Sequence, residues 1–216
     1  MSQSQATTER VRDHFEEQAG TFDALYNEDR LVQKTLRPGL HHRRKLAADV
    51  VRAHPDARVL DVGCGSGRVA EELLAAGAAA YVGIDFSEPM LDLSRQRLAR
   101  FGDKVTLVKG DFHEAPLEGR FDVIVALGLF DYIDEPHVFA RRMHELCADG
   151  GEVVASFPRW SWLKGPVRKV RYEWINDCPI FNYTERELRM MFGAAGFSKV
   201  EVLRATRSGF HVRAHR

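Results

Sequence analysis

A short apolar strand that ends in closely spaced glycines is the feature that most restricts how this chain can fold. The strand and the loop read Val59-Leu60-Asp61-Val62-Gly63-Cys64-Gly65-Ser66-Gly67, and a helical pattern starts at about Arg68. Glycines permit a tight turn and let a ligand approach the main chain closely. This order predicts a βαβ unit with a nucleotide-like ligand at the loop. Because Gly65-x-Gly67-x-x-Ala70 also satisfies the dinucleotide fingerprint, the segment alone does not decide which ligand binds.

The rest of the chain continues this alternation of strands and helices, which is typical of a parallel sheet covered by helices on both faces. Helix starts are indicated by Ser87, by Asp134 ahead of Pro136, and by the capping-box pair Thr184 and Glu187. The last two strands are too close together for a crossover helix, so we expect an antiparallel hairpin. The expected strands are Arg58–Val62, Ala80–Asp85, Val105–Lys109, Phe121–Leu127, Gly151–Phe157, Phe197–Arg204 and Gly209–Ala214.

The composition fits one soluble globular domain. Of the 216 residues, 44% are hydrophobic and 29% are charged, so the core needs no disulfide or metal to be stable. Lys plus Arg equals Asp plus Glu at 31 each, and no net charge draws the whole chain to nucleic acid or an anionic membrane. The three cysteines lie far apart, and no targeting or transmembrane segment is recognisable. These features predict reduced thiols and a cytoplasmic location.

Three acidic residues at the ends of the first three strands narrow the choice of ligand. Asp61 lies just before the loop, where it would repel phosphates and attract an ammonium group. Asp85 ends the second strand, where a carboxylate can accept both ribose hydroxyls. Asp111 follows the third strand and can accept a hydrogen bond from an adenine amine, with Phe112 beside it to cover the ring. A cationic adenosine without phosphates, such as S-adenosylmethionine, fits these charges better than NAD or FAD.

Three further motifs accompany the glycine loop: Gly83-Ile84-Asp85-Phe86-Ser87, Gly110-Asp111-Phe112 and Phe121-Asp122-Val123-Ile124-Val125. Together with the ending Ala195-Gly196-Phe197 before an edge hairpin, they make the chain similar to the class I S-adenosylmethionine-dependent methyltransferases. The resemblance implies a doubly wound, Rossmann-like α/β fold with an N-terminal helical cap. Its seven-stranded sheet would have the order 3-2-1-4-5-7-6, with strand 7 antiparallel. The implied cofactor is S-adenosyl-L-methionine.

By this resemblance the loop glycines hold the methionine part of the cofactor and Asp85 binds the ribose. The backbone around Leu127 and Gly128 would lie beside the transferred methyl group. Tyr26 looks like part of the aromatic cap of small-molecule methyltransferases of the quinone-biosynthesis type. The expected cofactor-binding residues are Asp61, Gly63, Cys64, Gly65, Gly67, Asp85, Phe86, Met90, Asp111, Phe112, Leu127 and Tyr26.

We expect a single methyltransferase domain over residues 1–216. Its parts are a helical cap (1–54), a cofactor-binding core (58–157), a basic aromatic insertion (158–182), and a final helix with an edge hairpin (183–216). After the fourth strand the chain lacks the Asn/Asp-Pro-Pro-Tyr/Phe tetrad of base and glutamine N-methyltransferases, and it has no Pro-Cys nucleophile. Both differences disfavour modification of nucleic acid.

The insertion is the best indication of the methyl acceptor. Between Arg159 and Arg171 basic and aromatic side chains are interleaved without an acid, which fits a lid over an anionic, flat or hydrophobic small molecule. Contact with RNA, an interface with a partner or an anionic membrane, and a solvated loop are the other interpretations. The basic run His41–Lys45 near the cap is interpreted as a solvated face. The insertion contains Arg159, Trp160, Trp162, Lys164, Arg168, Lys169, Arg171 and Tyr172.

Methyl transfer from a sulfonium is an in-line displacement that needs orientation, desolvation and, for a protonated acceptor, a base. No metal ligand set is expected. The candidate catalytic residues are Asp131 and Tyr132, which follow the fourth strand, and His113; helix capping, core packing and a solvated loop histidine are their alternatives. The predicted function is methyl transfer to a small-molecule acceptor. An RNA methyltransferase, an NAD-linked oxidoreductase and a non-catalytic S-adenosylmethionine-binding module remain as alternatives.

Overall fold

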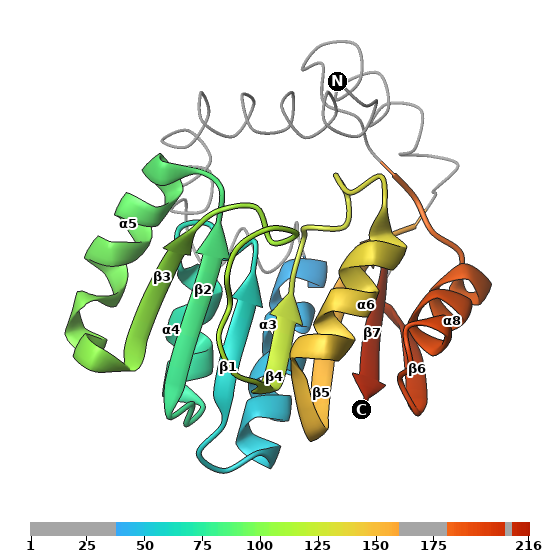
Figure 1. The fold of residues 1–216 in the computed structure, drawn as a ribbon, viewed down its shortest axis with the longest axis horizontal. Helices are drawn as coiled ribbons and strands as arrows, with labels where there is room; N and C mark the ends of the chain where they lie inside the picture. Colours follow the sequence, from blue (N-terminus) through green and yellow to red (C-terminus); the bar gives the residue numbers. More distant parts are fainter. Residues whose placement is uncertain (1–37, 160–180, 206–208) are drawn as a thin grey trace.

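The computed structural model describes residues 38–159, 181–205 and 209–216, which form a seven-stranded sheet with helices around it (Figure 1). The strand order is β3-β2-β1-β4-β5-β7-β6, and β7 is antiparallel to both of its neighbours. The predicted fold is therefore confirmed. Tyr26, most of the expected cap and most of the insertion lie outside the described residues. The strands are β1 (Arg58–Val62), β2 (Ala80–Asp85), β3 (Val105–Lys109), β4 (Phe121–Ala126), β5 (Cys147–Pro158), β6 (Lys199–Ala205) and β7 (Gly209–His215).

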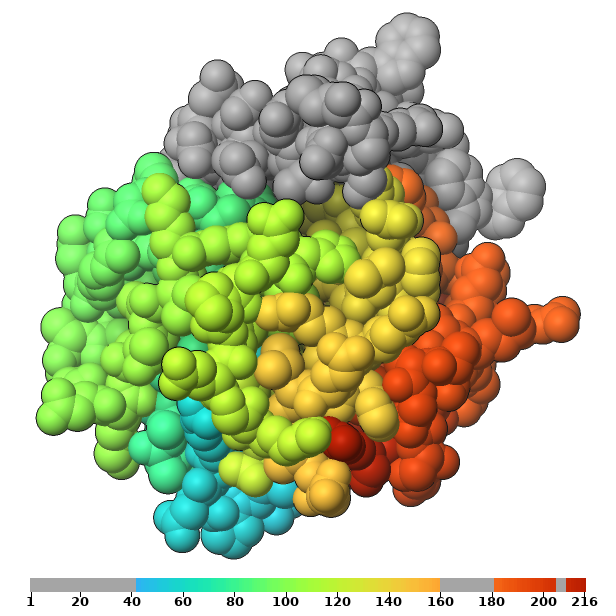
Figure 2. Space-filling model, viewed as in Figure 1, coloured from blue at the N-terminus to red at the C-terminus, as the bar shows by residue number. Residues whose placement is uncertain are grey.

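Helices cover both faces of the sheet, as a doubly wound fold requires. In Figure 1 α6 and α8 lie in front of the sheet, and α3 and α4 lie behind it. Figure 2 shows the front as a surface on which α6 and α8 are neighbours. The helices are α3 (Pro38–Ala53), α4 (Arg68–Ala75), α5 (Glu88–Leu98), the short 3-10 helix η1 (Ala99–Lys104), α6 (Pro136–Leu146) and α8 (Glu185–Ala194).

The central strand β4 separates two hydrophobic clusters. Val123 and Val125 face the helices α3, α4 and α5, whereas Ile124 and Ala126 face α6 and α8. All four side chains are fully buried. This burial on both faces explains why the β4 sequence is almost continuously apolar rather than alternating.

Two of the three predicted helix starts are confirmed. The Ser87 side chain accepts a hydrogen bond from the backbone N–H of Met90 at the start of α5, and Thr184 and Glu187 form the capping box of α8. The prediction of Asp134 as a helix cap was wrong. Helix α6 begins at Pro136 after Glu135, with no hydrogen bond from a capping side chain. Proline at the first helical position has a preset φ and no N–H to satisfy, so the helix begins there without such a cap.

Six strand ends differ from those predicted, and β5, β6 and β7 each end one residue later than expected. Strand β5 begins at Cys147, because Cys147 already pairs with Phe121 before a shift in register. Strand β4 ends at Ala126, one residue before the predicted Leu127. Strand β6 begins at Lys199, since Phe197 packs back against Phe192 of α8, with ring centroids 5.5 Å apart. Apolar patterning identifies each strand, whereas local packing sets its ends.

The last strand in the sequence, β7, lies inside the sheet between β5 and β6. Polar side chains of β7 contact both neighbours. Arg213 donates hydrogen bonds to both carboxylate oxygens of Glu152 in β5, and His215 lies 3.6 Å from the same carboxylate. Lys199 and Glu201 of β6 form an ion pair, and Glu201 lies 3.9 Å from His215. These contacts join the edge hairpin to the core.

Candidate functional site

The glycine loop after β1 has the backbone shape that its sequence predicts. Gly63, Gly65 and Gly67 have φ angles of +72°, +52° and +75°, a region that residues with a side chain rarely adopt. A Cβ atom on Gly67 would lie 2.6 Å from the Ser94 hydroxyl oxygen, so α5 packs directly against the loop. A Cβ atom on Gly65 would meet nothing within 4 Å. The loop is therefore closed by packing at Gly67 and open at Gly65.

Asp85 joins this loop to the start of α5. One carboxylate oxygen accepts the backbone N–H of Gly65 at 2.8 Å, and the other accepts the backbone N–H of Ser87 at 3.0 Å. Burial raises the pKa of Asp85 above its ordinary value, although the backbone N–H groups of Ser87, Gly65 and Phe86 lower it. Each carboxylate oxygen can accept a second hydrogen bond, so the group can hold the loop and bind ligand hydroxyls together.

Asp61 is more deeply buried than the sequence suggested. It is 2% exposed, and the hydroxyl group of Tyr81 donates a hydrogen bond to it at 2.9 Å. Burial raises the pKa of Asp61 to about 7, against the lowering effect of that hydrogen bond. The expectation of a carboxylate at the mouth of the loop is corrected accordingly. The cause is Gly83, which pairs with Asp61 and leaves space for the Tyr81 ring: a Cβ atom there would lie 3.0 Å from it.

Cys64 and Met90 also lie below the loop surface, each 6% exposed. The Cys64 thiol packs on Gly83, and burial raises its pKa well above the ordinary value, so the residue carries a neutral thiol rather than a thiolate. The backbone N–H of Met90 is taken up by Ser87. Phe86 is half-buried at the turn between β2 and α5.

The turn after β3 carries three candidates that differ in their contacts with α6. Asp111 is half-buried and accepts the backbone N–H of His113 at 2.8 Å, a local turn that fixes its carboxylate. Phe112 is 5% exposed and packs in the core against Phe139, with ring centroids 5.3 Å apart. The ring of His113 also contacts Phe139, edge-on at 4.6 Å. Of these three candidates, Asp111 alone is free of the contact with α6.

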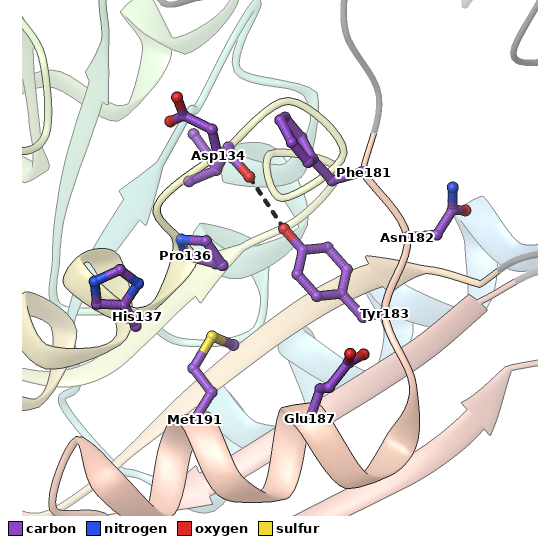
Figure 3. Close-up of a pocket in the computed structure, with 9 residues that line it drawn as sticks. Asp134, Pro136, His137, Phe181, Asn182, Tyr183, Glu187 and Met191 are labelled. Atoms are coloured by element: carbon purple, nitrogen blue, oxygen red, sulfur yellow. Dashed lines mark hydrogen bonds between the residues drawn. The ribbon is translucent and has the colours of Figure 1, made fainter. Parts of the chain in front are cut away.

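The segment after β4 carries Asp131 and Tyr132, and its backbone is attached to residues 181–183. The backbone N–H of Phe181 donates to the Asp131 carbonyl oxygen at 2.9 Å. The Tyr183 hydroxyl group lies 3.1 Å from the carbonyl oxygens of Phe130 and Ile133, and Figure 3 shows it pointing at this loop. The loop that holds the two catalytic candidates is therefore supported from the α8 side.

Beside this loop is a pocket of about 290 Å³ (Figure 3). Its lining comes from the β4–α6 loop, α6, residues 181–183 and α8, and none of it belongs to the glycine loop. The pocket thus lies apart from the residues expected to hold a cofactor. It is lined by Ile133, Asp134, Pro136, His137, Phe181, Asn182, Tyr183, Glu187 and Met191.

One residue of the site was missed by the sequence analysis. Arg43 of α3, interpreted as part of a solvated basic face, reaches the end of β4: a Cβ atom on Gly128 would lie 2.9 Å from its guanidinium nitrogen Nη1. The same nitrogen donates to the Ser156 hydroxyl oxygen at 3.4 Å. The φ of Gly128 is +83°, so both its backbone conformation and the nearby guanidinium group favour glycine at this position. A cation thus lies at the end of β4, on the other side of β1 from Asp85.

A family model described as "Methyltransferase domain" matches residues 39–202. The chain belongs to this methyltransferase family. The resemblance inferred from the four motifs is therefore confirmed. In this methyltransferase domain the matched part begins in α3 and ends in β6, so it includes Arg43, the glycine loop, Asp85 and the loop after β4.

Proteins of similar sequence are also methyltransferases. The chain is 35% identical over 106 residues to a ubiquinone biosynthesis O-methyltransferase from Aromatoleum aromaticum, which is 46% of this chain and 43% of that protein. It is 34% identical over 100 residues to a probable fatty acid methyltransferase from Pseudomonas putida, which is 44% of this chain and 25% of that protein. The chain thus matches less than half the length of each of these relatives.

Solved structures resemble this methyltransferase domain over nearly its whole length. The magnesium protoporphyrin IX methyltransferase from Synechocystis with bound SAH has a TM-score of 0.78 at 21% identity, covering 97% of this chain and 99% of that one. A 1,6-didemethyltoxoflavin-N1-methyltransferase from Burkholderia thailandensis has a TM-score of 0.73 at 18% identity, covering 100% of this chain and 91% of that one. At these identities the similarity establishes a shared fold.

Two features are absent from the part of the methyltransferase domain that the structure describes. None of its helices has the length and apolar character needed to cross a lipid bilayer. Within the same residues, no three His, Cys, Asp or Glu side chains are grouped as a metal ion would require.

Proposed function

We propose that this methyltransferase domain transfers a methyl group from S-adenosylmethionine to a small-molecule acceptor by direct in-line displacement. The observation that carries the proposal is the 2.8 Å hydrogen bond between the Gly65 N–H and the Asp85 carboxylate. It holds an acid at the end of β2 directly against an open glycine loop, the arrangement that receives a ribose. Phosphate-free ligands are favoured because Asp85 and Asp111 place acids at the strand ends beside the loop.

The charges along the strand ends fit the parts of S-adenosylmethionine in order. Asp111 would accept the adenine amine, Asp85 the ribose hydroxyls, and Asp61, through the loop, would attract the ammonium group. Arg43 beside Gly128 would bind the carboxylate, for which a guanidinium is well shaped. When bound, S-adenosylmethionine supplies a methyl group on a sulfonium, a carbon already activated by its leaving group.

The chain's own contribution to the reaction is orientation and exclusion of water. The backbone at Leu127 and Gly128 would lie beside the methyl group, and Asp131 and Tyr132 follow it on the loop that Tyr183 supports. One of these two, or His113 after the adenine acid, would take a proton from a protonated acceptor. The contact of His113 with Phe139 favours the first two.

Ligand-dependent melting distinguishes this function from its alternatives. S-adenosylhomocysteine at about 100 times its dissociation constant should stabilise the chain by about 2.7 kcal/mol, a melting shift of about 5–10 °C for this size. NADH should give no shift. A shift with NADH alone would indicate an oxidoreductase. A shift with neither ligand would contradict the proposal.

Replacing Asp85 by alanine tests the site itself. The variant loses a charge-assisted pair of ribose hydrogen bonds, so the affinity for S-adenosylhomocysteine should fall by about 1.5–3 kcal/mol, measured by titration calorimetry. The matched control is Asp122→Ala, whose carboxylate accepts the backbone N–H of Arg58 at the opposite end of β1. Equal affinities of the Asp85 variant and the parent would place the ribose elsewhere.

The acceptor we propose is a small anionic or flat aromatic molecule in the cytoplasm. The basic and aromatic composition of residues 159–172 supports it, as do the quinone, fatty-acid and porphyrin methyltransferases among the similar proteins. Transfer of labelled methyl to 3,4-dihydroxybenzoate, compared with uncharged catechol, measures the preference for an anion. An RNA substrate would be revealed by methylation that falls steeply as salt rises. Transfer to RNA alone would overturn the choice of acceptor.

A further inference from the structure

Residues from three elements meet where β4 ends. The backbone N–H of Gly128, just beyond β4, donates to the Ser156 hydroxyl oxygen at 2.8 Å. Arg43 of α3 donates to the same oxygen at 3.4 Å. Ser156 lies in β5 and is 6% exposed. A single buried oxygen atom therefore connects the loop beside the expected methyl group with the only cation that we assign to the cofactor.

The fit around Gly128 leaves little freedom to this arrangement. Its φ of +83° is unfavourable for any residue with a side chain, and a Cβ atom would lie 2.9 Å from Arg43 Nη1. The guanidinium group consequently packs on the bare α-carbon of Gly128. Ser156 accepts from both partners of this contact, so it sets the distance between them.

A second contact, between α3 and β7, lies beside Arg43. The ring of His42, next to Arg43, stacks on His211 of β7, with centroids 5.2 Å apart and planes 21° apart. His211 is 3% exposed and pairs with Ser156 across the β5–β7 ladder. Burial lowers the pKa of His211 to about 4, with the nearby His42 and Arg43 adding to the shift. At neutral pH His211 is therefore uncharged and adds no cation beside Arg43.

We propose that Ser156 is a positioning residue of the cofactor site, whose hydroxyl oxygen holds the Arg43 guanidinium over Gly128 to receive the cofactor's carboxylate. The inference rests on the proposed function, which places the carboxylate at Arg43. An arginine side chain has many rotamers, and ordering it on binding weakens affinity. An oxygen that orders the guanidinium beforehand removes part of this loss.

A pair of ligands separates positioning from a general disturbance of the site. S-adenosylhomocysteine has the amino acid end that Arg43 would bind, whereas 5′-methylthioadenosine lacks it. Ser156→Ala should bind S-adenosylhomocysteine about five- to tenfold more weakly in titration calorimetry, the effect of losing one or two modest hydrogen bonds. Its affinity for 5′-methylthioadenosine should stay within about twofold, because that ligand does not use Arg43.

Three further comparisons test whether this result has another explanation. Ser156→Cys, which keeps the shape but is a weaker acceptor, should show the same selective loss. In an Arg43→Ala background, Ser156→Ala should weaken S-adenosylhomocysteine no further, since the two residues act through one contact. Ser198→Ala removes a hydroxyl that donates to the His215 carbonyl oxygen, and it should bind both ligands as the parent does.

The outcomes separate the inference from the function on which it rests. If the parent chain binds neither ligand, the proposed function fails, and this is measured before any variant. If the parent binds both and Ser156→Ala weakens both equally, or weakens neither, the positioning role is refuted while the function stands. Additive losses in the Arg43→Ala background would refute it as well.

Discussion

Replacing Asp61 by asparagine tests the buried carboxylate under the glycine loop. Burial raises the pKa of Asp61 from 3.8 to about 7, so ionising it in the folded chain costs about 4 kcal/mol more than in the unfolded chain. The direction of the pH dependence of stability follows from the number of protons bound in each state. Below pH 4 both states keep the proton and the group has no effect. Between about pH 4 and pH 7 the unfolded chain loses it first, so stability falls as the pH rises.

The asparagine variant removes this loss because it has no charge, and its amide oxygen can still accept the Tyr81 hydroxyl group. Urea unfolding followed by circular dichroism at a series of pH values measures the difference. The stability advantage of Asp61→Asn over the parent should grow by about 3 kcal/mol between pH 5 and pH 8. Groups that titrate in both proteins cancel in this comparison, except for the coupled carboxylate of Asp85.

Two results would refute the reasoning. If the stability difference between Asp61→Asn and the parent does not change with pH, Asp61 titrates normally. If the variant becomes less stable than the parent at high pH, the folded chain stabilises the charge of Asp61. Tyr81→Phe provides the opposite control: it removes the hydrogen bond that lowers the pKa of Asp61, so its stability deficit should increase with pH. The affinity for S-adenosylhomocysteine should fall in Asp61→Asn even where stability rises, because the ammonium group loses its acid.

Two other substitutions examine the loop after β4. Gly128→Ala should destabilise the chain by about 1–2 kcal/mol in urea unfolding, because alanine is strained at this positive φ. It should also weaken S-adenosylhomocysteine binding, because the new Cβ atom displaces Arg43. The control is Gly150→Ala, at a φ of +78° with nothing within 4 Å of its Cβ atom, which should be destabilised without losing affinity. Equal affinities of the two variants would contradict the contact. Tyr183→Phe should lose about 1 kcal/mol of stability and speed hydrogen exchange after β4, measured by mass spectrometry; unchanged exchange there would show that the hydroxyl group does not hold the loop.

The sequence allowed the sheet to be predicted closely because its signals are local. Short β-branched runs between helical patterns predicted strands β1, β2 and β3 with their observed ends, and the capping pair Thr184 and Glu187 marked the start of α8. The strand order came from the family resemblance. Asp85 could also be placed in advance, because the carboxyl end of a parallel strand fixes where its last side chain lies.

Contacts between distant residues could not be predicted in this way. Arg43 belongs to a basic run whose pattern is that of an exposed helix face, and only the fold brings it to Gly128. Phe112 was placed over a ligand because it follows Asp111, but side-chain direction depends on what α6 offers, and Phe139 draws the ring into the core. Asp61 was expected near the surface because nothing local shows that Tyr81 fills the space above Gly83.

The central place of β7 has a consequence for how the chain is made on the ribosome. Until Gly209–His215 emerge, the apolar strand β5 has an open edge, and β6 has no partner in the sheet. From the emergence of β5 until that of β7, the nascent chain therefore exposes a ready template for intermolecular pairing. A stop codon before Gly209 would leave this template permanently exposed, so we expect such a fragment to aggregate even though every residue that we assign to the cofactor is already present.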